Sequence, residues 1–262
     1  NIHGNYQVGG LIGNGYYSLI TNNYTTGHTT GRKEVGGLIG YSSHGITTFN
    51  FTTGNTQSHG TGVYGLSTGG LIGSDYNSLT TNNYTTGNTI SIAPYTGGLI
   101  GQARRGNILN NYSTGNVTGT ERVGGLIGTV FLSWPEPGST IKYNYSTGII
   151  TSNNYTGGLI GSINAGTITN NYTISKTNGS NGYQGGFSAM HYGVASFANN
   201  YWDINLTQQT NCHNDSNTGC DYTYNEESSY FGSTGIPFDE TKLNWDRNWQ
   251  ANENGHPTLI PN

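Results

Sequence analysis

The side chains that could perform acid–base catalysis are few in this sequence and lie far apart. Glu34 and Glu121 occupy nearly equivalent places in a repeated pattern, but they fall three repeats apart, about 14 Å if each repeat adds one strand to a sheet. Hydrolases built on stacked strands need an acid and a base within about 5 to 10 Å of one bond. Neither HExxH nor GxSxG occurs. The sequence therefore predicts a protein that is not an enzyme and has no cofactor.

Metal-ligating residues do not form a recognisable set either. The seven histidines share no position in the repeat, and Asp203, Asp215 and Asp221 lack the regular spacing of a calcium loop. The two cysteines, Cys212 and Cys220, are close in the sequence. Such a pair, with no other cysteine in the chain, predicts one disulfide that closes a short loop and hence an oxidising, extracellular compartment.

A repeated triplet, Asn-aromatic-Thr/Ser, matches the sequon for N-glycosylation. If the aromatic residue of each triplet faces inward, the asparagine faces outward and is open to modification. The structural alternative is that the asparagine amides hydrogen-bond from one repeat to the next in a ladder. The candidate glycosylation sites are Asn23, Asn50, Asn83, Asn111, Asn144 and Asn171.

The element that must position these residues is the repeat Gly-Gly-Leu-Ile-Gly. Successive full copies start 27, 33, 28, 27 and 33 residues apart, and a decayed copy at Gly185 follows 28 residues after the last. A period of about 20 to 50 residues is typical of solenoids and propellers. The full copies start at Gly9, Gly36, Gly69, Gly97, Gly124 and Gly157.

The residues before each triplet alternate like a half-buried strand. In the first repeat the alternation groups Ile20, Asn22 and Tyr24 on one face, taken as the inner one, and places Asn23 on the other. No stretch predicts a helix. We therefore expect an all-β fold: a β-solenoid (β-helix) of about seven coils over residues 1–200, followed by an irregular C-terminal tail or cap over residues 201–262.

Leucine and isoleucine are adjacent in each Gly-Gly-Leu-Ile-Gly, so a strand would point them to opposite faces. With Leu38 and its equivalents inside, Ile39 and its equivalents would form an outer apolar stripe that needs a cover. The aromatic residues of the tail are the expected cover, either on their own chain or on a neighbouring one.

Charge divides at the same boundary. Residues 1–200 have a net charge of +3, and residues 201–262 have a net charge of −7. A mildly basic body with an acidic tail argues against a nucleic-acid partner. The sequence has no run of about 18 apolar residues, so no membrane span is expected.

The repeat also carries a family resemblance. Gly-Gly-Leu-Ile-Gly followed by Ile-x-Asn-Asn-Tyr-x-x-Gly resembles the GLUG repeat of bacterial and archaeal surface proteins, including filamentous-haemagglutinin-like adhesins. The closing segment, with Asn200-Tyr201-Trp202-Asp203 and residues 252–259, is similar to the tail of such proteins, although the cysteine-bearing loop departs from that pattern. The resemblance covers nearly the whole chain and implies a secreted β-helical surface protein, without implying an activity.

Two functions of different kinds are then expected. A solenoid exposes strand edges at its ends, and no cap is predicted over the first coil, so the first expectation is a surface filament or adhesin stalk that assembles head to tail through its solenoid ends and tail. The alternative is a monomeric adhesin module whose exposed aromatic residues bind glycans. A minor alternative, ice binding, depends on an outward lattice of Thr and Asn. The candidate contact residues are Phe131, Trp134, Tyr230, Phe231, Trp245 and Trp249.

Overall fold

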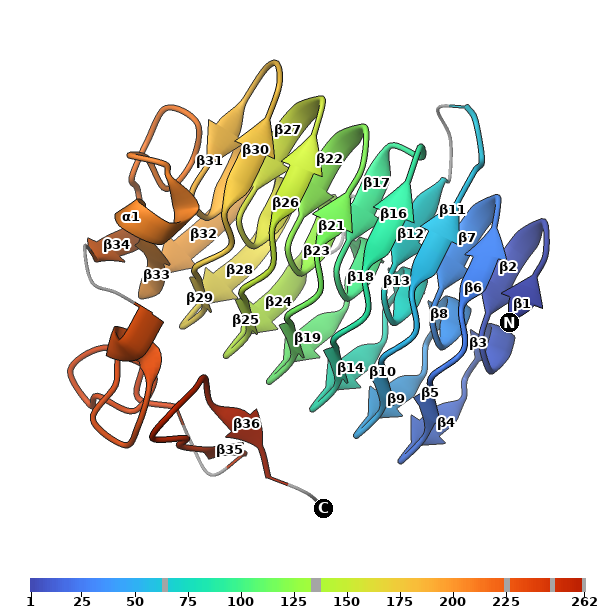
Figure 1. Ribbon diagram of the computed structural model, residues 1–262, viewed down its shortest axis with the longest axis horizontal. Helices are drawn as coiled ribbons and strands as arrows, with labels where there is room; N and C mark the ends of the chain where they lie inside the picture. The colour runs from blue at the N-terminus through green and yellow to red at the C-terminus, as the bar shows by residue number, and fades with distance from the viewer. Residues whose placement is uncertain (63–65, 133–137, 224–226, 246–247, 261–262) are drawn as a thin grey trace.

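The chain forms a β-solenoid in which strands of successive coils stack in parallel along one axis (Figure 1). The structure is a computed structural model that describes residues 1–62, 66–132, 138–223, 227–245 and 248–260. Pairing joins equivalent residues of successive coils; for example, Ile72 lies between Ile39 and Ile100. The prediction of an all-β solenoid is therefore confirmed.

The described solenoid strands form four sheets that run along the axis. The first contains β1 (Ile2–His3), β6 (Thr29–Gly31), β11 (Thr56–Ser58), β16 (Thr89–Ser91), β21 (Val117–Thr118), β26 (Ile150–Ser152) and β30 (Thr177–Gly179). The second contains β2 (Tyr6–Gly9), β7 (Lys33–Gly36), β12 (Ser67–Gly69), β17 (Tyr95–Gly97), β22 (Glu121–Gly124), β27 (Asn154–Gly157) and β31 (Gln184–Gly185).

The third sheet doubles back, because β28 belongs to two successive sides of its coil. It contains β3 (Ile12–Tyr16), β8 (Ile39–Ser43), β13 (Ile72–Tyr76), β18 (Ile100–Arg104), β23 (Ile127–Phe131), β28 (Ile160–Thr169), β32 (Ser188–Ala198), β24 (Ser139–Lys142), β19 (Asn107–Leu109), β14 (Leu79–Thr81), β9 (Ile46–Thr48) and β4 (Leu19–Thr21). The fourth contains β5 (Tyr24–Thr25), β10 (Phe51–Thr52), β15 (Tyr84–Thr85), β20 (Tyr112–Ser113), β25 (Tyr145–Ser146), β29 (Tyr172–Thr173), β33 (Asn200–Asp203) and β34 (Cys220–Thr223).

Both apolar residues of Gly-Gly-Leu-Ile-Gly lie inside the solenoid. The chain bends at Gly37 and Leu38, between β7 and β8, and both Leu38 and Ile39 are fully buried. Their amide nitrogens donate to the same carbonyl oxygen, that of Leu71 in the next coil, at 3.0 and 2.9 Å. The predicted outer stripe of isoleucines is therefore wrong, because the bend interrupts the alternation on which it depended. The same burial holds for Ile72, Ile100, Ile127 and Ile160.

The glycines of the repeat allow the backbones of successive coils to approach closely. A Cβ atom on Gly69 would lie 2.7 Å from both the amide nitrogen of Gly101 and the carbonyl oxygen of Leu99. We expect Gly69→Ala to lower the free energy of unfolding by about 2 to 3 kcal/mol, because the coils must separate to admit the methyl group. Gly27→Ala is the matched control, since its added Cβ would have its nearest neighbour at 3.4 Å. Chemical denaturation of the two variants checks this, and equal losses would contradict it.

A second corner decides which side chains of the triplet face inward. Asn110 has a φ of 54°, in the left-handed region that asparagine tolerates better than most residues. This turn shifts the alternation by one residue, so that Ile108 and Asn111 are both fully buried. The aromatic residue faces outward instead, and Tyr24 of the first coil is 63% exposed. The predicted facing is wrong for both asparagine and aromatic residue, because it assumed unbroken alternation. Positive φ also occurs at Asn22, Phe49, Asn82, Tyr143, Asn170 and Asn199.

The chain beyond residue 200 has two parts with different positions. Strands β33 and β34 extend the fourth sheet, and between them lie the short helix α1 (Ile204–Thr207) and the cysteine-bearing loop. We call residues 204–220 the cap. Residues 227–260, the lateral segment, carry a 3₁₀ turn η1 (Glu227–Tyr230) and the antiparallel pair β35 (Trp249–Gln250) and β36 (Thr258–Leu259). In Figure 1 the lateral segment, in red, lies along the flank of the coils.

Candidate functional site

The asparagines of the triplets form a buried hydrogen-bonded ladder. The Nδ2 atom of Asn83 donates to the carbonyl oxygen of Thr47 at 2.9 Å and to Oδ1 of Asn111 at 3.1 Å. Asn23 of the first coil is half-buried. The outward orientation expected for these six sequons is therefore wrong, and the folded chain does not present the buried Nδ2 atoms for glycosylation. The fully buried members are Asn50, Asn83, Asn111, Asn144 and Asn171.

The lattice required for ice binding is missing from the described coils. Its asparagines are the buried ladder, and its second threonine also faces inward: Thr85 is fully buried and donates to the carbonyl oxygen of Gly98 at 2.8 Å. Thr52 makes the equivalent bond to Gly70. The lattice on which the ice-binding alternative depends is therefore absent from these coils, because the asparagine and the second threonine of the unit point into the solenoid.

The outward aromatic residues of the triplets stack into a second ladder, the aromatic ladder. Successive ring centroids lie 4.8 to 5.2 Å apart, and the planes of neighbouring rings differ by 1° to 9°. The stacking follows from parallel in-register pairing, which places equivalent rings one strand spacing apart. Its members are Tyr24, Phe51, Tyr84, Tyr112, Tyr145 and Tyr172.

The lateral segment covers the carboxyl-terminal half of the aromatic ladder. Tyr145 and Tyr172 are 2% and 0% exposed, against 63% for Tyr24 at the other end. Trp249 packs on Tyr112 and Tyr145 with ring centroids 6.0 and 5.6 Å apart. The expectation that the tail covers a solenoid is met on its own chain, although it covers tyrosines and not isoleucines, because the tyrosines are the outward apolar row.

Polar atoms on the lateral segment fix its register on the ladder. The indole nitrogen of Trp245 donates to the carbonyl oxygen of Asn170 at 3.0 Å, and that of Trp249 donates to Oδ1 of Asn110 at 3.0 Å. The hydroxyl of Tyr145 donates to the carbonyl oxygen of Pro257 at 2.9 Å. Burial under this segment raises the pKa of Tyr145 well above its usual value.

Three of the six predicted contact residues are consequently buried. Tyr230, Trp245 and Trp249 are 0%, 5% and 4% exposed, so the prediction that they contact a ligand is wrong. They belong to the intrachain interface because their apolar side chains pack on the aromatic ladder of the same chain. Phe231 is half-buried with its ring edge-on to that of His256 at 5.2 Å.

The other two predicted contact residues belong to the fifth repeat. Phe131 ends β23, is half-buried, and lies under the guanidinium of Arg104, 4.8 Å from the ring centroid. The ring of Tyr95 meets it edge-on at 5.3 Å. Trp134 lies outside the described residues. The structure thus places Phe131 on a flank, in contact with β17 and β18 of the preceding coil.

The amino-terminal coil is an open rung. Strands β1 to β5 are the last described strands at this end of the four sheets, so no strand pairs with their outer edges within the described chain. Two of its apolar side chains are correspondingly exposed, Tyr6 at 73% and Leu11 at 52%. The equivalents of Leu11 in the next coils are fully buried, so the exposure comes from position and not from sequence.

The cap covers part of the opposite end. The amides of Gly186 and Phe187 donate to the carbonyl oxygens of Asn211 and Cys212, each at 2.8 Å, which continues the corner of the repeat by one rung. The predicted disulfide between Cys212 and Cys220 is present and ties this rung to β34. Because the two sulfurs are bonded to each other, they do not act with His213, which lies close to both, as a metal-binding set.

The neutral side chain of His213 stabilises the cap through two hydrogen bonds. Its Nε2 atom donates to the carbonyl oxygen of Thr218 at 3.2 Å, so the neutral ring accepts at Nδ1 from the hydroxyl of Ser188 at 2.7 Å. Burial and the neighbouring His191 lower the pKa of His213 to about 4.

We expect the cap to open as the pH falls from 6.5 toward 4. In this window the unfolded cap binds a proton at His213 that the folded cap does not, so stability that is complete above pH 6.5 is lost with falling pH, by about 2 to 3 kcal/mol. Hydrogen exchange of the Gly186 and Phe187 amides measures the opening. His213→Gln removes the titrating group, and undiminished pH dependence in that variant would contradict the assignment.

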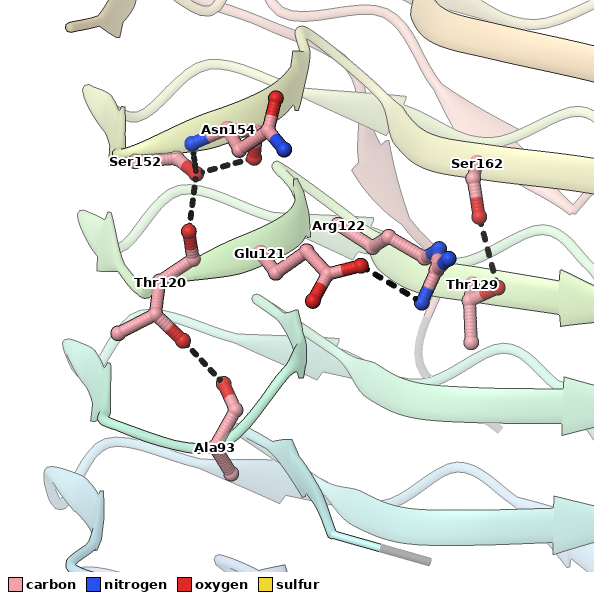
Figure 2. Close-up of polar contacts among 8 residues, drawn as sticks. All are labelled: Ala93, Thr120, Glu121, Arg122, Thr129, Ser152, Asn154 and Ser162. Atoms are coloured by element: carbon pink, nitrogen blue, oxygen red, sulfur yellow. Dashed lines mark hydrogen bonds and ion pairs between the residues drawn. The ribbon is translucent and has the colours of Figure 1, made fainter. Parts of the chain in front are cut away.

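Two carboxylates of the solenoid, those of Glu121 and Asp75, have partners within the solenoid. Glu121 is ion-paired with Arg122 at 2.9 Å (Figure 2). Figure 2 also shows hydroxyl contacts that join neighbouring coils here, including Thr129 with Ser162 at 2.9 Å. Asp75 lies inside the solenoid, where burial raises its pKa and its Oδ2 atom accepts from the hydroxyl of Thr80 at 2.8 Å.

A pocket of about 400 Å³ lies between the aromatic ladder and residues 258–260 of the lateral segment. Its walls include Phe51, Tyr84 and Tyr112 of the aromatic ladder, the corner residue Asn82, and Leu259 of β36. Sequence reasoning missed this pocket, because it depends on how residues 258–260 dock on the ladder. The left-handed corner asparagines were the available signal, since asparagine favours that conformation.

No family model, curated protein or solved structure matches this chain. Within the described residues, none of the helices has the length and apolar character needed to cross a membrane. The site is therefore defined by its geometry alone: an open rung, a partly covered aromatic ladder and a disulfide-tied cap.

Proposed function

We propose that this chain is a non-enzymatic structural subunit of an extracellular surface filament or adhesin stalk, which assembles head to tail through its solenoid ends. The observation that carries the proposal is that the third sheet begins at β3 and reaches β32 at the other end, with parallel pairing throughout. A second copy placed with its β3 and β4 against the part of β32 that the cap leaves exposed, around Val194, would continue the same sheet with the same strand direction.

The exposed side chains at the two ends support this contact. Leu11 lies on the open rung and is 52% exposed, and Val194 of β32 is 76% exposed. Stacking a further coil buries the equivalents of Leu11 completely in the interior coils. A heterologous contact of this kind repeats without closing and gives a filament.

The positions of the cap and the lateral segment restrict which strands of the chain can pair with a second copy. The cap engages the beginning of β32 as well as the corner after β31, because the amide of Ser188 donates to the carbonyl oxygen of Cys212 at 3.0 Å and that of Asn214 to the carbonyl oxygen of Ala189 at 3.3 Å. Pairing with a second copy is therefore expected at the exposed part of β32 around Val194 and at β34. The lateral segment is engaged on its own ladder, so the proposal rests on the solenoid ends and not on the tail. The resemblance to GLUG-repeat surface proteins and the disulfide favour an extracellular site.

The glycan-binding alternative has less support. Three of its predicted contact residues, Tyr230, Trp245 and Trp249, are buried in the intrachain interface. The aromatic ladder presents ring edges to its flank, because its faces are stacked on each other, whereas sugars pack on aromatic faces.

Electron microscopy and sedimentation of the purified chain test the proposal. We expect filaments from the wild-type chain, and loss of filaments in Leu11→Arg and Val194→Arg, which put a charge at each end of the contact. Ile149→Arg is the matched control, because Ile149 is 45% exposed on a turn between coils. A wild-type chain that stays monomeric at high concentration would overturn the proposal, as would filaments unaffected by both end variants.

A further inference from the structure

The pocket beside the aromatic ladder repeats a site that this chain fills one coil further on. Thr81 pairs with Leu109, and Tyr84 pairs with Tyr112, so Asn82 and Asn110 occupy equivalent positions. Both are corner residues with positive φ, 57° and 54°. The two sites therefore share their backbone geometry, their amide side chain and their tyrosine.

The filled site shows what this geometry binds. At Asn110 the indole of Trp249 lies against Tyr112 and Tyr145, and its nitrogen donates to Oδ1 of Asn110 at 3.0 Å. The recognition elements are thus an aromatic wall and one amide acceptor at the corner. A buried Trp finds a partner for its N–H in this way.

The pocket at Asn82 has the same elements without the indole. The Oδ1 atom of Asn82 is buried and accepts no hydrogen bond from the described residues. Tyr84 and Tyr112, the equivalents one coil back of the wall at the filled site, provide the aromatic wall. Leu259 of the lateral segment lines the pocket as well. A buried acceptor without a donor costs free energy, which a ligand with an N–H group would recover.

We propose that this pocket binds a tryptophan side chain presented by a segment of a partner protein, which would extend the lateral segment's cover along the aromatic ladder. Continuity with the intrachain interface argues for a peptide: the new segment would lie next to β36 and place its indole as Trp249 places its own. The described tryptophans are buried in other intrachain contacts and do not line the pocket: Trp202, Trp245 and Trp249.

The test uses the full chain and ring-fluorinated N-acetyltryptophanamide followed by fluorine NMR. We expect saturable binding, weakened about fivefold when the indole nitrogen of the probe is methylated, because one hydrogen bond is lost. Asn82→Gly keeps the left-handed corner and removes the amide, so it should weaken the unmethylated probe by a similar factor. Asn77→Gly, at an exposed corner of another side with a φ of 52°, is the matched control and should bind normally.

Each other outcome counts against the proposal. Equal binding of the methylated probe, or normal binding by Asn82→Gly, would remove the amide as the recognition element. Absence of saturable binding in a wild-type chain whose ladder amides stay protected would overturn the site itself. If the wild-type chain self-associates and Asn82→Gly abolishes this, the pocket binds a second copy of the chain. The proposal of a different partner protein would then be wrong.

Discussion

Asn111→Ala is expected to lower the free energy of unfolding by about 3 to 5 kcal/mol, because it leaves several buried groups without partners. The Nδ2 atom of Asn111 donates to the carbonyl oxygens of Thr80 and Leu109 at 2.9 and 2.8 Å. Its Oδ1 atom accepts from the amide nitrogen of Asn83 at 2.9 Å. All of these bonds lie in the fully buried ladder, where water cannot replace them.

Asn23→Ala is the matched control for this ladder. Asn23 occupies the same repeat position in the open rung, is half-buried, and has one neighbouring coil in place of two. We expect a loss of about 1 kcal/mol there, the value of one ordinary hydrogen bond. Urea denaturation of both variants measures the difference. A loss at Asn111 no larger than that at Asn23 would show that the ladder does not stabilise the solenoid.

Trp249→Ala is expected to weaken docking of the lateral segment by about 3 to 5 kcal/mol, since a buried indole leaves a large cavity. The variant loses ring contacts with Tyr112, Tyr145 and Trp245, the last with centroids 4.5 Å apart, and the hydrogen bond to Asn110. The solenoid coils should remain folded, because their core lies on the other side of the ladder. Protease sensitivity and hydrogen exchange of residues 248–260 measure the undocking.

Tyrosine titration gives a second readout of the same variant. In the folded wild-type chain, burial raises the pKa of Tyr112 and Tyr145, so these phenols keep their protons above pH 10 while those of the unfolded chain ionise. Docking is therefore stable up to about pH 10 and weakens above it. Trp249→Ala should return both pKa values toward 10, as seen in tyrosinate absorbance. Phe231→Ala, at the edge of the segment, should not, and an unchanged titration in Trp249→Ala would contradict the assigned cover.

The repeat determined much of the fold by itself. Six copies of Gly-Gly-Leu-Ile-Gly at intervals of 27 to 33 residues require equivalent residues to stack, because one unit cannot bury its apolar side chains alone. The disulfide followed from Cys212 and Cys220 being the two cysteines of the chain. These inferences depend on spacing and chemical type, which the sequence states directly.

Whether a side chain points into the solenoid or out of it depended on two bends in each coil, which the periodicity of the sequence does not reveal. A bend at Gly37 and Leu38 turns both Leu38 and Ile39 inward, and a left-handed residue such as Asn110 shifts the alternation by one. Each corner changes the backbone direction within one or two residues, so a strand pattern counted across it assigns the wrong face. This is why Asn111 was expected at the surface and is buried.

The sequence by itself determined that this chain is a stack of parallel coils with an aromatic, disulfide-bearing end. Only the tertiary structure decided which row of side chains the end covers and where that cover stops. Docking of the lateral segment on Tyr145 and Tyr172 is a contact between segments far apart in the chain. It depends on which apolar side chains the folded solenoid leaves on its surface. The pocket at Asn82 lies where residues 258–260 of this docked segment meet the aromatic ladder.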